Sequence, residues 1–405
     1  MNTKKVIIVG GGFGGIKCAL DLSSKHLSNT KIILISDKSH FEYHAALYRV
    51  VAGSSPLEVC IPLNDIFKGK NVEVITDKVL SIDLEKNTMC GQSDCTYSYD
   101  YLVLALGSET AYFDIPGLQE NSFGMKSINE ALRLNKHLHN VFSECALNIE
   151  TGDTECATHI VVVGGGATGT ELAAELAIYT RELAQKHGLD PRLVTIDLIE
   201  LSSHLVSLLP EDASLKIEER MRSLGVNIFL NRGVVKEEVE KVYLKDIEMR
   251  SKTVIWTAGT RANRLYKDVG LEVNKKGQVS VTNHLQAVGH NNVFVIGDGA
   301  ATNYSGMAQT ALFDGEYVAD VIYALFQQKE PKEYSAPPPF YSIPVGRDWA
   351  AYVNGSKRYY GKVGWWLRRW VDFHVFSTIL PFEKAVVAFQ DGRTISETCD
   401  ICSKN

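Results

Sequence analysis

Two runs of consecutive apolar residues, each ending in a glycine cluster, dominate the pattern of hydrophobic and polar positions along this chain. Residues 6–9 read Val-Ile-Ile-Val, and residues 159–163 read His-Ile-Val-Val-Val. Continuous β-branched runs of this length predict strands that are buried on both faces of a parallel sheet. A helix-period segment and a further apolar strand, at 31–35 and 194–199, follow the two runs, so each predicts a βαβ unit.

The two units are copies of one arrangement. The glycine clusters at 10–15 and 164–169 lie 154 residues apart, and a second matching pair, 102–108 and 254–260, lies 152 residues apart. Near-constant offsets in the same order indicate an internal repeat. The sequence therefore predicts an α/β fold that contains two Rossmann-like dinucleotide-binding domains.

The spacing of the glycines predicts what the two copies bind. In G-x-G-x-x-G, the first glycine makes a tight turn, the second lets a pyrophosphate approach the backbone, and the third lets the helix pack closely on the strand. The candidate cofactor-binding residues are therefore Gly10, Gly12 and Gly15 in the first copy, with Phe13 and Gly14 inside the motif, and Gly164, Gly166 and Gly169 in the second.

The two copies differ where the second strand ends. Glu200 follows the apolar strand of the second copy, and residues 201–204 contain no Arg or Lys. A carboxylate at this position can bind the 2′-hydroxyl of the NADH ribose. The 2′-phosphate of NADPH would need a nearby cation, and the segment has none, so the second copy favours NADH over NADPH. In the first copy the position holds Ser36 and Asp37, and Asp37 is the candidate for the ribose.

A third signal lies far downstream. The apolar run 293–296 ends in Gly297 and Asp298, which places a carboxylate at the carboxyl end of a strand. That end of an open α/β sheet is where ligands bind, although a plain turn after a strand would read the same way.

Composition narrows the class of protein. The chain has 405 residues, with 45% hydrophobic and 22% charged positions, a net charge of -6 and a pI near 6.0. These values predict a globular protein of two or three domains and argue against a nucleic-acid binder. Eight scattered cysteines and a first strand close to Met1 predict a reducing, cytoplasmic compartment. No run of about 18 uninterrupted apolar residues predicts a membrane span.

The paired glycine clusters and the Gly-Asp element together resemble those of the two-dinucleotide flavoprotein oxidoreductases. In that family the first copy binds FAD, the second binds NAD(P)H, and the Gly-Asp carboxylate reaches the ribityl chain of the flavin. Four stretches are similar to the type II NADH dehydrogenases, which are single-chain NADH:quinone oxidoreductases: 40–48, 164–176, 254–263 and 308–311. The likeness covers roughly residues 4 to 350. It implies FAD and NADH as cofactors, a quinone as electron acceptor, and cofactor contacts at Ala105, Gly107, Ala258, Gly259 and Ala308.

The resemblance also implies two catalytic positions. Gln309 matches a residue at the quinone side of the flavin ring, and Glu171 matches a glutamate near the nicotinamide and the flavin. Each has a structural alternative, because a carboxylate favours the N-terminal end of a helix and Gln309 precedes an apolar helical segment. The chain departs from the family at 313–314, where a second glutamine is common, and at 342–345, where a hairpin that carries a lysine is abbreviated.

The cysteines exclude a related chemistry. Enzymes that reduce disulfides need two sulfurs within bridging distance next to the flavin, and no close pair stands at either usual location. Sulfide:quinone oxidoreductases need flavin-side cysteines as well. The one close pair, Cys399 and Cys402, is interpreted as part of a frayed terminus, with a redox tail or half a metal site as alternatives. No resident metal ion is predicted.

The segment after the Pro-rich break at 336–339 has a composition of its own. Between 357 and 372 there are five basic residues and one acid, and three of the five tryptophans lie here. This pattern predicts a basic amphipathic helix that contacts an anionic membrane surface, with a dimer or domain interface as the alternative. The apolar face would consist of Val363, Trp366, Leu367, Trp370 and Phe373, with Arg368 and Arg369 pointing elsewhere.

The sequence-based interpretation is a non-proton-pumping NADH:quinone oxidoreductase. We expect an FAD domain at 1–115 and 271–330, an NADH domain at 116–270, and a C-terminal contact region at 331–405. We also expect a homodimer held peripherally on the cytoplasmic side of the membrane, with no nucleic-acid partner. Two alternatives stay open: a soluble reductase that uses oxygen, a ferredoxin or a disulfide carrier, and an NADH-sensing flavoprotein with negligible turnover.

Overall fold

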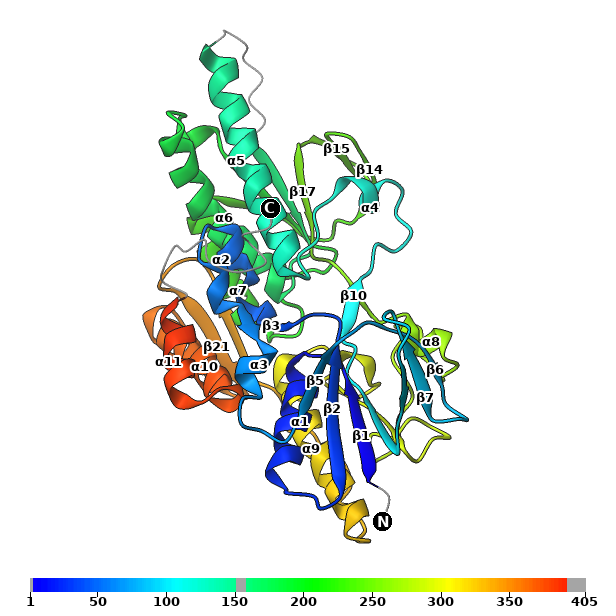
Figure 1. Ribbon diagram of the computed structural model, residues 1–405. Helices are drawn as coiled ribbons and strands as arrows, with labels where there is room; N and C mark the ends of the chain where they lie inside the picture. The colour runs from blue at the N-terminus through cyan, green and yellow to red at the C-terminus, as the bar shows by residue number, and fades with distance from the viewer. Residues whose placement is uncertain (1–2, 151–157, 392–405) are drawn as a thin grey trace.

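Two parallel β-sheets organise the molecule. The computed structural model describes residues 3–150 and 158–391, and Cys399 and Cys402 lie outside these ranges. The first sheet forms one lobe and the second sheet the other (Figure 1). In spatial order, the first sheet contains β19 (Val293–Val295), β9 (Tyr101–Leu104), β1 (Lys4–Val9), β2 (Thr30–Ser36) and β5 (Glu73–Thr76). The second contains β13 (Val226–Phe229), β12 (Thr195–Ile199), β11 (His159–Val163) and β17 (Thr253–Trp256).

The internal repeat is confirmed by the strand register. Val9, the last residue of β1, pairs with Ile35 of β2 and Leu104 of β9. Its counterpart Val163 pairs with Ile199 of β12 and Trp256 of β17. The motifs that the repeat relates in sequence therefore end at the same edge of each sheet. The expected α/β fold with paired dinucleotide-binding units is confirmed.

Each sheet is covered on both faces. The first packs against α1 (Phe13–Ser24) and α9 (Ala308–Phe326) on one side, and its other face shares a core with a small antiparallel sheet of β6 (Val79–Asp83), β7 (Thr88–Gly91) and β8 (Thr96–Ser98). Helix α6 (Ala167–Lys186) packs on the second sheet, and the antiparallel strands β14 (Val234–Glu238), β15 (Lys241–Leu244) and β16 (Glu248–Arg250) cover its other face.

A pair of short strands connects the lobes. β10 (Ser108–Thr110) and β18 (Thr260–Ala262) run antiparallel between them (Figure 1). The chain returns to the first lobe directly after β18, because Tyr266 of α8 (Leu265–Asp268) is fully buried in the core of the first sheet.

Further helices and strands complete both lobes. In the first lobe these are β3 (His40–Glu42), η1 (His44–Ala46), α2 (Leu47–Val51), η2 (Pro56–Glu58), β4 (Cys60–Pro62), α3 (Leu63–Ile66) and η4 (Gly297–Gly299). In the second they are α4 (Leu118–Asn121), α5 (Ile128–Glu150), η3 (Pro191–Leu193) and α7 (Glu211–Ser223).

The C-terminal region forms a third packing unit. A small sheet of β20 (Tyr341–Pro344), β21 (Ala350–Asn354) and β22 (Lys357–Tyr359) precedes α10 (Lys362–Ile379) and α11 (Phe382–Asp391). Helix α10 packs against this sheet, against α11 and against α1, so it contacts the first lobe directly. In the described ranges, no helix combines the length and the apolar character that crossing a membrane requires.

The polarity of α10 corrects the sequence-based picture of this helix. Arg368, Arg369 and Asp372 are buried, whereas Trp366 and Trp370 are 73% and 59% exposed. Arg368 and Arg369 therefore do not contribute to a cationic outer face, although Lys362 at the start of the helix is exposed. Composition correctly identified an unusual helix, but it did not show that the charges point inward, because their partners come from distant parts of the chain.

One buried carboxyl group in the second lobe gives a prediction about stability. Glu237 of β14 is 4% exposed, and its Oε2 atom has no hydrogen-bond partner among the described residues. Burial raises the pKa of Glu237 to about 8. Because the folded protein holds this proton more tightly than the unfolded chain does, the stability that it contributes is present below its ordinary pKa of 4.5 and is lost as pH rises through about 8.

We expect the variant Glu237→Gln to gain melting temperature over the wild type as pH rises from 6 to 9, because its amide cannot ionise. Calorimetric melting temperatures across this range measure the gain. The control is Glu238→Gln, whose exposed neighbouring carboxylate bonds Lys236 and Tyr243; it should keep the wild-type pH dependence. A constant difference between Glu237→Gln and the wild type would contradict the assignment.

Candidate active site

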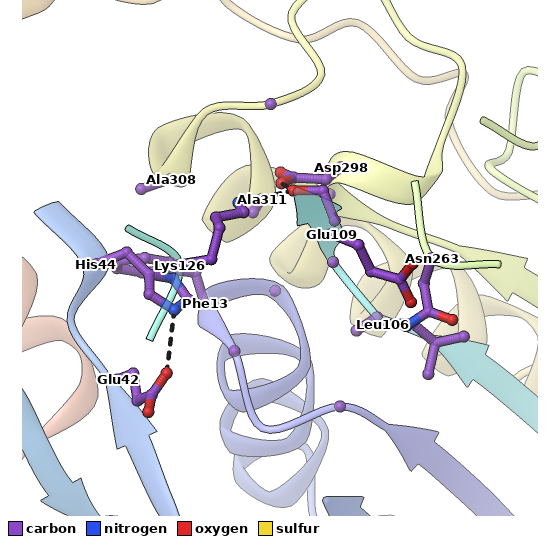
Figure 2. Close-up of a pocket in the computed structure, with 18 of the residues that line it drawn as sticks. Phe13, Glu42, His44, Leu106, Glu109, Lys126, Asn263, Asp298, Ala308 and Ala311 are labelled. Carbon is purple, nitrogen blue, oxygen red and sulfur yellow. Dashed lines mark hydrogen bonds and ion pairs between the residues drawn. The ribbon is translucent and has the colours of Figure 1, made fainter. Parts of the chain in front are cut away.

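One large cavity of about 1040 Å³ collects most of the predicted residues. The carboxyl ends of β1, β2 and β9 contribute to its wall, as do the first turns of α1, α6 and α9 and the strand β20. Both lobes and the C-terminal region therefore line one space. Figure 2 shows part of this wall, with Phe13, His44 and Lys126 on one side and Asp298 and Asn263 on the other.

The first glycine turn has the geometry of a phosphate cradle. Gly10 has a φ of +118°, and a Cβ atom there would lie 2.2 Å from the Ala105 carbonyl oxygen. A Cβ on Gly15 would lie 2.0 Å from the Gly10 carbonyl oxygen, so both positions require glycine. Gly12 instead faces open space and begins α1 without a capping hydrogen bond from a described side chain. The free N–H groups of this helix end suit a pyrophosphate.

The second glycine turn repeats this geometry. Gly164 has a φ of +107°, and a Cβ on Gly169 would lie 1.8 Å from the Gly164 carbonyl oxygen. Gly166 faces open space and begins α6, again without a cap from a described side chain. Gly166 lines the same cavity as the first turn. The two helix ends can therefore serve two dinucleotides whose reactive ends meet in one space.

The predicted cofactor-binding residues fall into two groups, those that line the cavity and those that do not. Those that line the cavity are Gly10, Gly12, Phe13, Gly14, Asp37, Ala105, Gly107, Gly166, Gly297, Asp298 and Ala308. Those that lie outside its lining are Gly15, Gly164, Gly169, Glu200, Ala258 and Gly259. The turns need glycine at three of these positions because a side chain there would clash with neighbouring backbone, even though a ligand in the cavity would not touch them: Gly15, Gly164 and Gly169.

The carboxylate of Glu200 is held toward the second glycine turn. It accepts the backbone N–H groups of Gly165 at 2.5 Å and Ser202 at 2.7 Å. Arg232, which is distant in sequence, donates its backbone N–H to the Glu200 carbonyl oxygen, but its guanidinium pairs with Asp246 at 3.0 Å. The acid that the sequence indicated therefore lies beside the second glycine turn.

The Asp298 carboxylate belongs to a chain of hydrogen bonds that crosses between the lobes. The Ser108 hydroxyl donates to Asp298 at 2.5 Å, and the Lys126 ammonium donates to Ser108 at 2.8 Å. All three residues line the cavity. Sequence reasoning missed Lys126, because nothing in its local pattern distinguishes it from a surface lysine.

A second acid, Asp314, supports the Gly-Asp turn from behind. It is fully buried, accepts the Gly297 N–H at 2.9 Å and accepts the Tyr334 hydroxyl at 2.6 Å. Burial raises the pKa of Asp314 to about 6. Asp314 stands in the segment where the resemblance implies a second glutamine, and its hydrogen bond to Gly297 holds the turn in place.

Gln309 lines the cavity, but its carboxamide is already engaged. The amide nitrogen donates to the Phe340 carbonyl oxygen at 2.8 Å, and the amide oxygen accepts the Phe340 N–H at 3.4 Å. Gln309 therefore clamps the segment that leads into β20, which forms another part of the cavity wall.

Glu171 faces the cavity from the second turn of α6 and is 8% exposed. Its Oε1 atom lies 3.4 Å from Nη1 of Arg368 in α10. Burial raises the pKa of Glu171 to about 7, although the nearby Arg368 and Arg49 guanidinium groups act to lower it. A carboxyl group in this setting changes charge near neutral pH.

Arg368 connects three parts of the cavity wall. Besides Glu171, its guanidinium donates to the Ser342 carbonyl oxygen at 2.9 Å, to the Ala45 carbonyl oxygen at 2.8 Å and to Asp372 at 3.0 Å. Glu171, Ser342 and Ala45 all line the cavity. Sequence reasoning placed Arg368 on an outer surface. The only local signal of a buried role was its i, i+4 spacing to Asp372.

The buried charged side chains of α10 also bond to residues of the first lobe. Asp372 accepts hydrogen bonds from the Tyr43 hydroxyl at 2.7 Å and from Arg49 at 2.9 Å. Arg49 also donates to Glu58 at 2.5 Å. Because each of these buried groups is paired, the network avoids the penalty of an isolated buried charge. The network fixes α10 against the segment that contains η1 and α2.

A second buried carboxylate, Glu42, lies at the cavity wall near η1. Lys38 donates to it at 2.6 Å, His44 Nε2 lies 3.3 Å away, His40 Nε2 lies 3.5 Å away, and the Ile128 N–H donates at 3.3 Å. These partners hold the pKa of Glu42 well below its usual range despite burial. The sequence offered this stretch only as part of a resemblance and assigned no role to its histidines.

Comparisons with known proteins agree with this geometry. A profile of the pyridine nucleotide-disulphide oxidoreductase family matches residues 4–315. The type II NADH:quinone oxidoreductase Ndh of Mycobacterium tuberculosis is 30% identical over 347 residues, which cover 81% of this chain and 74% of that protein. The type II NADH:quinone oxidoreductase of Staphylococcus haemolyticus is 29% identical, with 79% and 82% covered.

Solved structures show the same fold over nearly the whole chain. NDH2 from Plasmodium falciparum, in complex with NADH, superposes with a TM-score of 0.86 at 17% identity and covers 97% of this chain and 98% of that one. The sulfide:quinone oxidoreductase of Aquifex aeolicus superposes with a TM-score of 0.78 at 22% identity, with 95% and 94% covered. The family resemblance seen in the sequence is thus confirmed: the chain belongs to the pyridine nucleotide-disulphide oxidoreductase family and, within it, to the type II NADH:quinone oxidoreductases.

Proposed function

We propose that this protein is an FAD-dependent NADH:quinone oxidoreductase. The observation that carries the proposal is that both glycine turns open on one cavity, which Glu171 and the Gln309 clamp also line. Relatives that carry this activity in their names, matched over about four fifths of the chain, support it. Bound FAD would accept a hydride from NADH and release two electrons to a quinone.

The residues present fit the two dinucleotides. The open Gly12 position and the uncapped start of α1 would hold the FAD pyrophosphate, with Asp37 at the ribose and Asp298 at the ribityl chain. Gly166 and Glu200 would serve NADH in the same way. We accordingly propose an FAD domain at 1–115 and 271–330, an NADH domain at 116–270 and a C-terminal contact region at 331–405. The packing of Tyr266 into the first core supports ending the NADH domain a few residues earlier.

The proposed test begins with the purified protein. We expect it to be yellow, to lose its flavin absorbance when NADH but not NADPH is added without oxygen, and to regain it when a quinone is added. Stopped-flow absorbance measures both half-reactions. A protein without flavin, or a reduced flavin that no quinone reoxidises, would contradict the proposal, and oxidation by a ferredoxin or a disulfide carrier alone would favour a soluble reductase.

We further propose that Glu171 acts on the NADH half-reaction. The nicotinamide ring becomes cationic as it loses its hydride, and a carboxylate that faces the cavity stabilises that charge. Glu171 supplies this charge only when it is ionised, above its pKa of about 7. Gln309 would act on the quinone side by fixing the wall that Phe340 and β20 form.

We expect the rate of flavin reduction by NADH to rise several-fold between pH 6 and 8 in the wild type and to stay at its low-pH value in Glu171→Gln. Anaerobic stopped-flow reduction across this range measures it. The control, Glu175→Gln, lies one turn later on α6, pairs with Arg347 and lies outside the cavity lining, so it should keep the wild-type profile. An unchanged pH profile in Glu171→Gln would remove the role.

We also propose a peripheral membrane contact, on the cytoplasmic side, through the exposed face of α10 and α11. Trp366, Trp370 and Phe382 are the large side chains of this face, and Val363 and Val387 extend it. Aromatic and aliphatic groups exposed together in this way are typical of surfaces that bind a partner or a membrane. Because Arg368 and Arg369 are buried, apolar insertion rather than attraction to anionic lipid supplies most of the proposed binding. A homodimer that uses this face is the alternative occupant.

We expect the double variant Trp366→Ser and Trp370→Ser to bind lipid vesicles at least about tenfold more weakly than the wild type, because two large apolar groups no longer leave water. Flotation with phosphatidylcholine and phosphatidylglycerol vesicles measures binding. The control is Leu193→Ser and Leu215→Ser, which removes exposed apolar groups in the second lobe. If the wild type does not float, while the tryptophan variant abolishes a dimer seen in sedimentation, the face is a dimer interface.

A further inference from the structure

The cavity wall holds a carboxylate–imidazole pair that the proposed function does not yet use. His44 begins η1, and its Nε2 atom lies 3.3 Å from Oε2 of Glu42 (Figure 2). Both residues line the cavity. No hydrogen bond within the described ranges engages the other ring nitrogen of His44, Nδ1. One nitrogen is therefore anchored by a carboxylate and the other remains available to a substrate.

Glu42 is well suited to orient and support the imidazole. The group is buried, and Lys38, the Ile128 N–H and His40 surround it in addition to His44. With these partners it stays ionised, so it can stabilise an imidazolium without taking the proton itself. The same carboxylate fixes the orientation of the ring.

The placement of His44 brings it to the end of the cavity where the three parts of the molecule meet. The carbonyl oxygen of the next residue, Ala45, accepts a hydrogen bond from Arg368 at 2.8 Å. The same guanidinium contacts Glu171 of the second lobe and Ser342 of the C-terminal region. Lys126, which precedes α5 by two residues, also lines the cavity, and its ammonium extends to Ser108, next to Asp298.

The chemistry of quinone reduction requires a proton donor. The overall reaction is NADH + H⁺ + quinone → NAD⁺ + hydroquinone. The hydride supplies two electrons and one proton, so one further proton must reach a quinone oxygen from water through the protein. His44 suits this step, because its side chain is 45% exposed and water can restore its proton. The Lys38 ammonium is bound to Glu42 and the Lys126 ammonium to Ser108.

We propose that His44 is the catalytic acid that donates the second proton to the quinone, with Glu42 as its positioning residue. The inference rests on the proposed function. In the step, the Nδ1–H bond of the imidazolium breaks and an O–H bond forms on the quinone as it accepts its two electrons. His44 is left neutral, with its Nε2–H still directed to Glu42, and a proton from water then restores the imidazolium.

The test separates electron transfer from proton transfer. In anaerobic stopped-flow experiments, NADH-reduced wild type and His44→Gln are mixed either with a soluble quinone or with ferricyanide, which accepts electrons without protons. We expect His44→Gln to be reduced by NADH and reoxidised by ferricyanide within twofold of the wild type, but reoxidised by the quinone about 100-fold more slowly.

A second measurement does not depend on turnover. Diethyl pyrocarbonate modifies accessible imidazoles, and mass spectrometry locates the modification. We expect modification of His44 in the wild-type holoenzyme and protection of His44 by a redox-inactive quinone analogue. His284, whose Nδ1 atom contacts the Tyr317 hydroxyl outside the cavity lining, should be modified equally with and without the analogue.

A histidine outside the cavity lining, His284, provides the control variant. His284→Gln should retain wild-type rates with both oxidants. The proposal is overturned if His44→Gln is reoxidised by the quinone at the wild-type rate, if ferricyanide reoxidation slows equally, or if the analogue does not protect His44. A wild type that ferricyanide reoxidises but no quinone does would overturn the proposed function itself, and with it the role of His44.

Discussion

The structure depends on one requirement: the charges that α10 carries into the protein interior must all be paired. Arg368 and Asp372 are buried, and their partners come from both lobes and from the C-terminal sheet. Losing one partner of such a buried pair costs about 3–5 kcal/mol, far more than losing one partner of an exposed ion pair. The position of α10 is therefore set by electrostatics as much as by apolar contact.

This requirement links the scaffold to the chemistry. The guanidinium that satisfies Asp372 also meets Glu171 and the carbonyl oxygens of Ala45 and Ser342, all of which line the cavity. The charge on Glu171 and the position of η1, which begins at His44, thus both depend on the Arg368 guanidinium. With Arg368, Arg369 and Asp372 buried, Trp366, Trp370 and Phe382 are the large exposed side chains on the outward side of α10 and α11. A single helix in this way contacts the cavity wall on its inner side and exposes two tryptophans on its outer side.

The two glycine turns show how much local sequence can specify. Gly10 and Gly164 have positive φ values and leave no room for a side chain, and Gly12 and Gly166 leave open space at a helix end. These constraints act over a few neighbouring residues, so the motif predicts them. The repeat then fixes the matching strand registers. Neither the glycine motif nor the repeat predicted that Lys126 lines the cavity, because the position of Lys126 depends on how the two lobes meet.

By itself, the sequence determined the α/β fold, its internal duplication, the two phosphate cradles and the position of Glu200, since each follows from steric and apolar patterns over short distances. The tertiary structure alone decided which charges of α10 point inward, that Gln309 binds the Phe340 backbone, and that Glu42 orients His44 toward the cavity. The physical reason is the same in each case. A polar side chain is buried or exposed according to the partners available to it, and here those partners lie tens to hundreds of residues away or depend on how a loop closes.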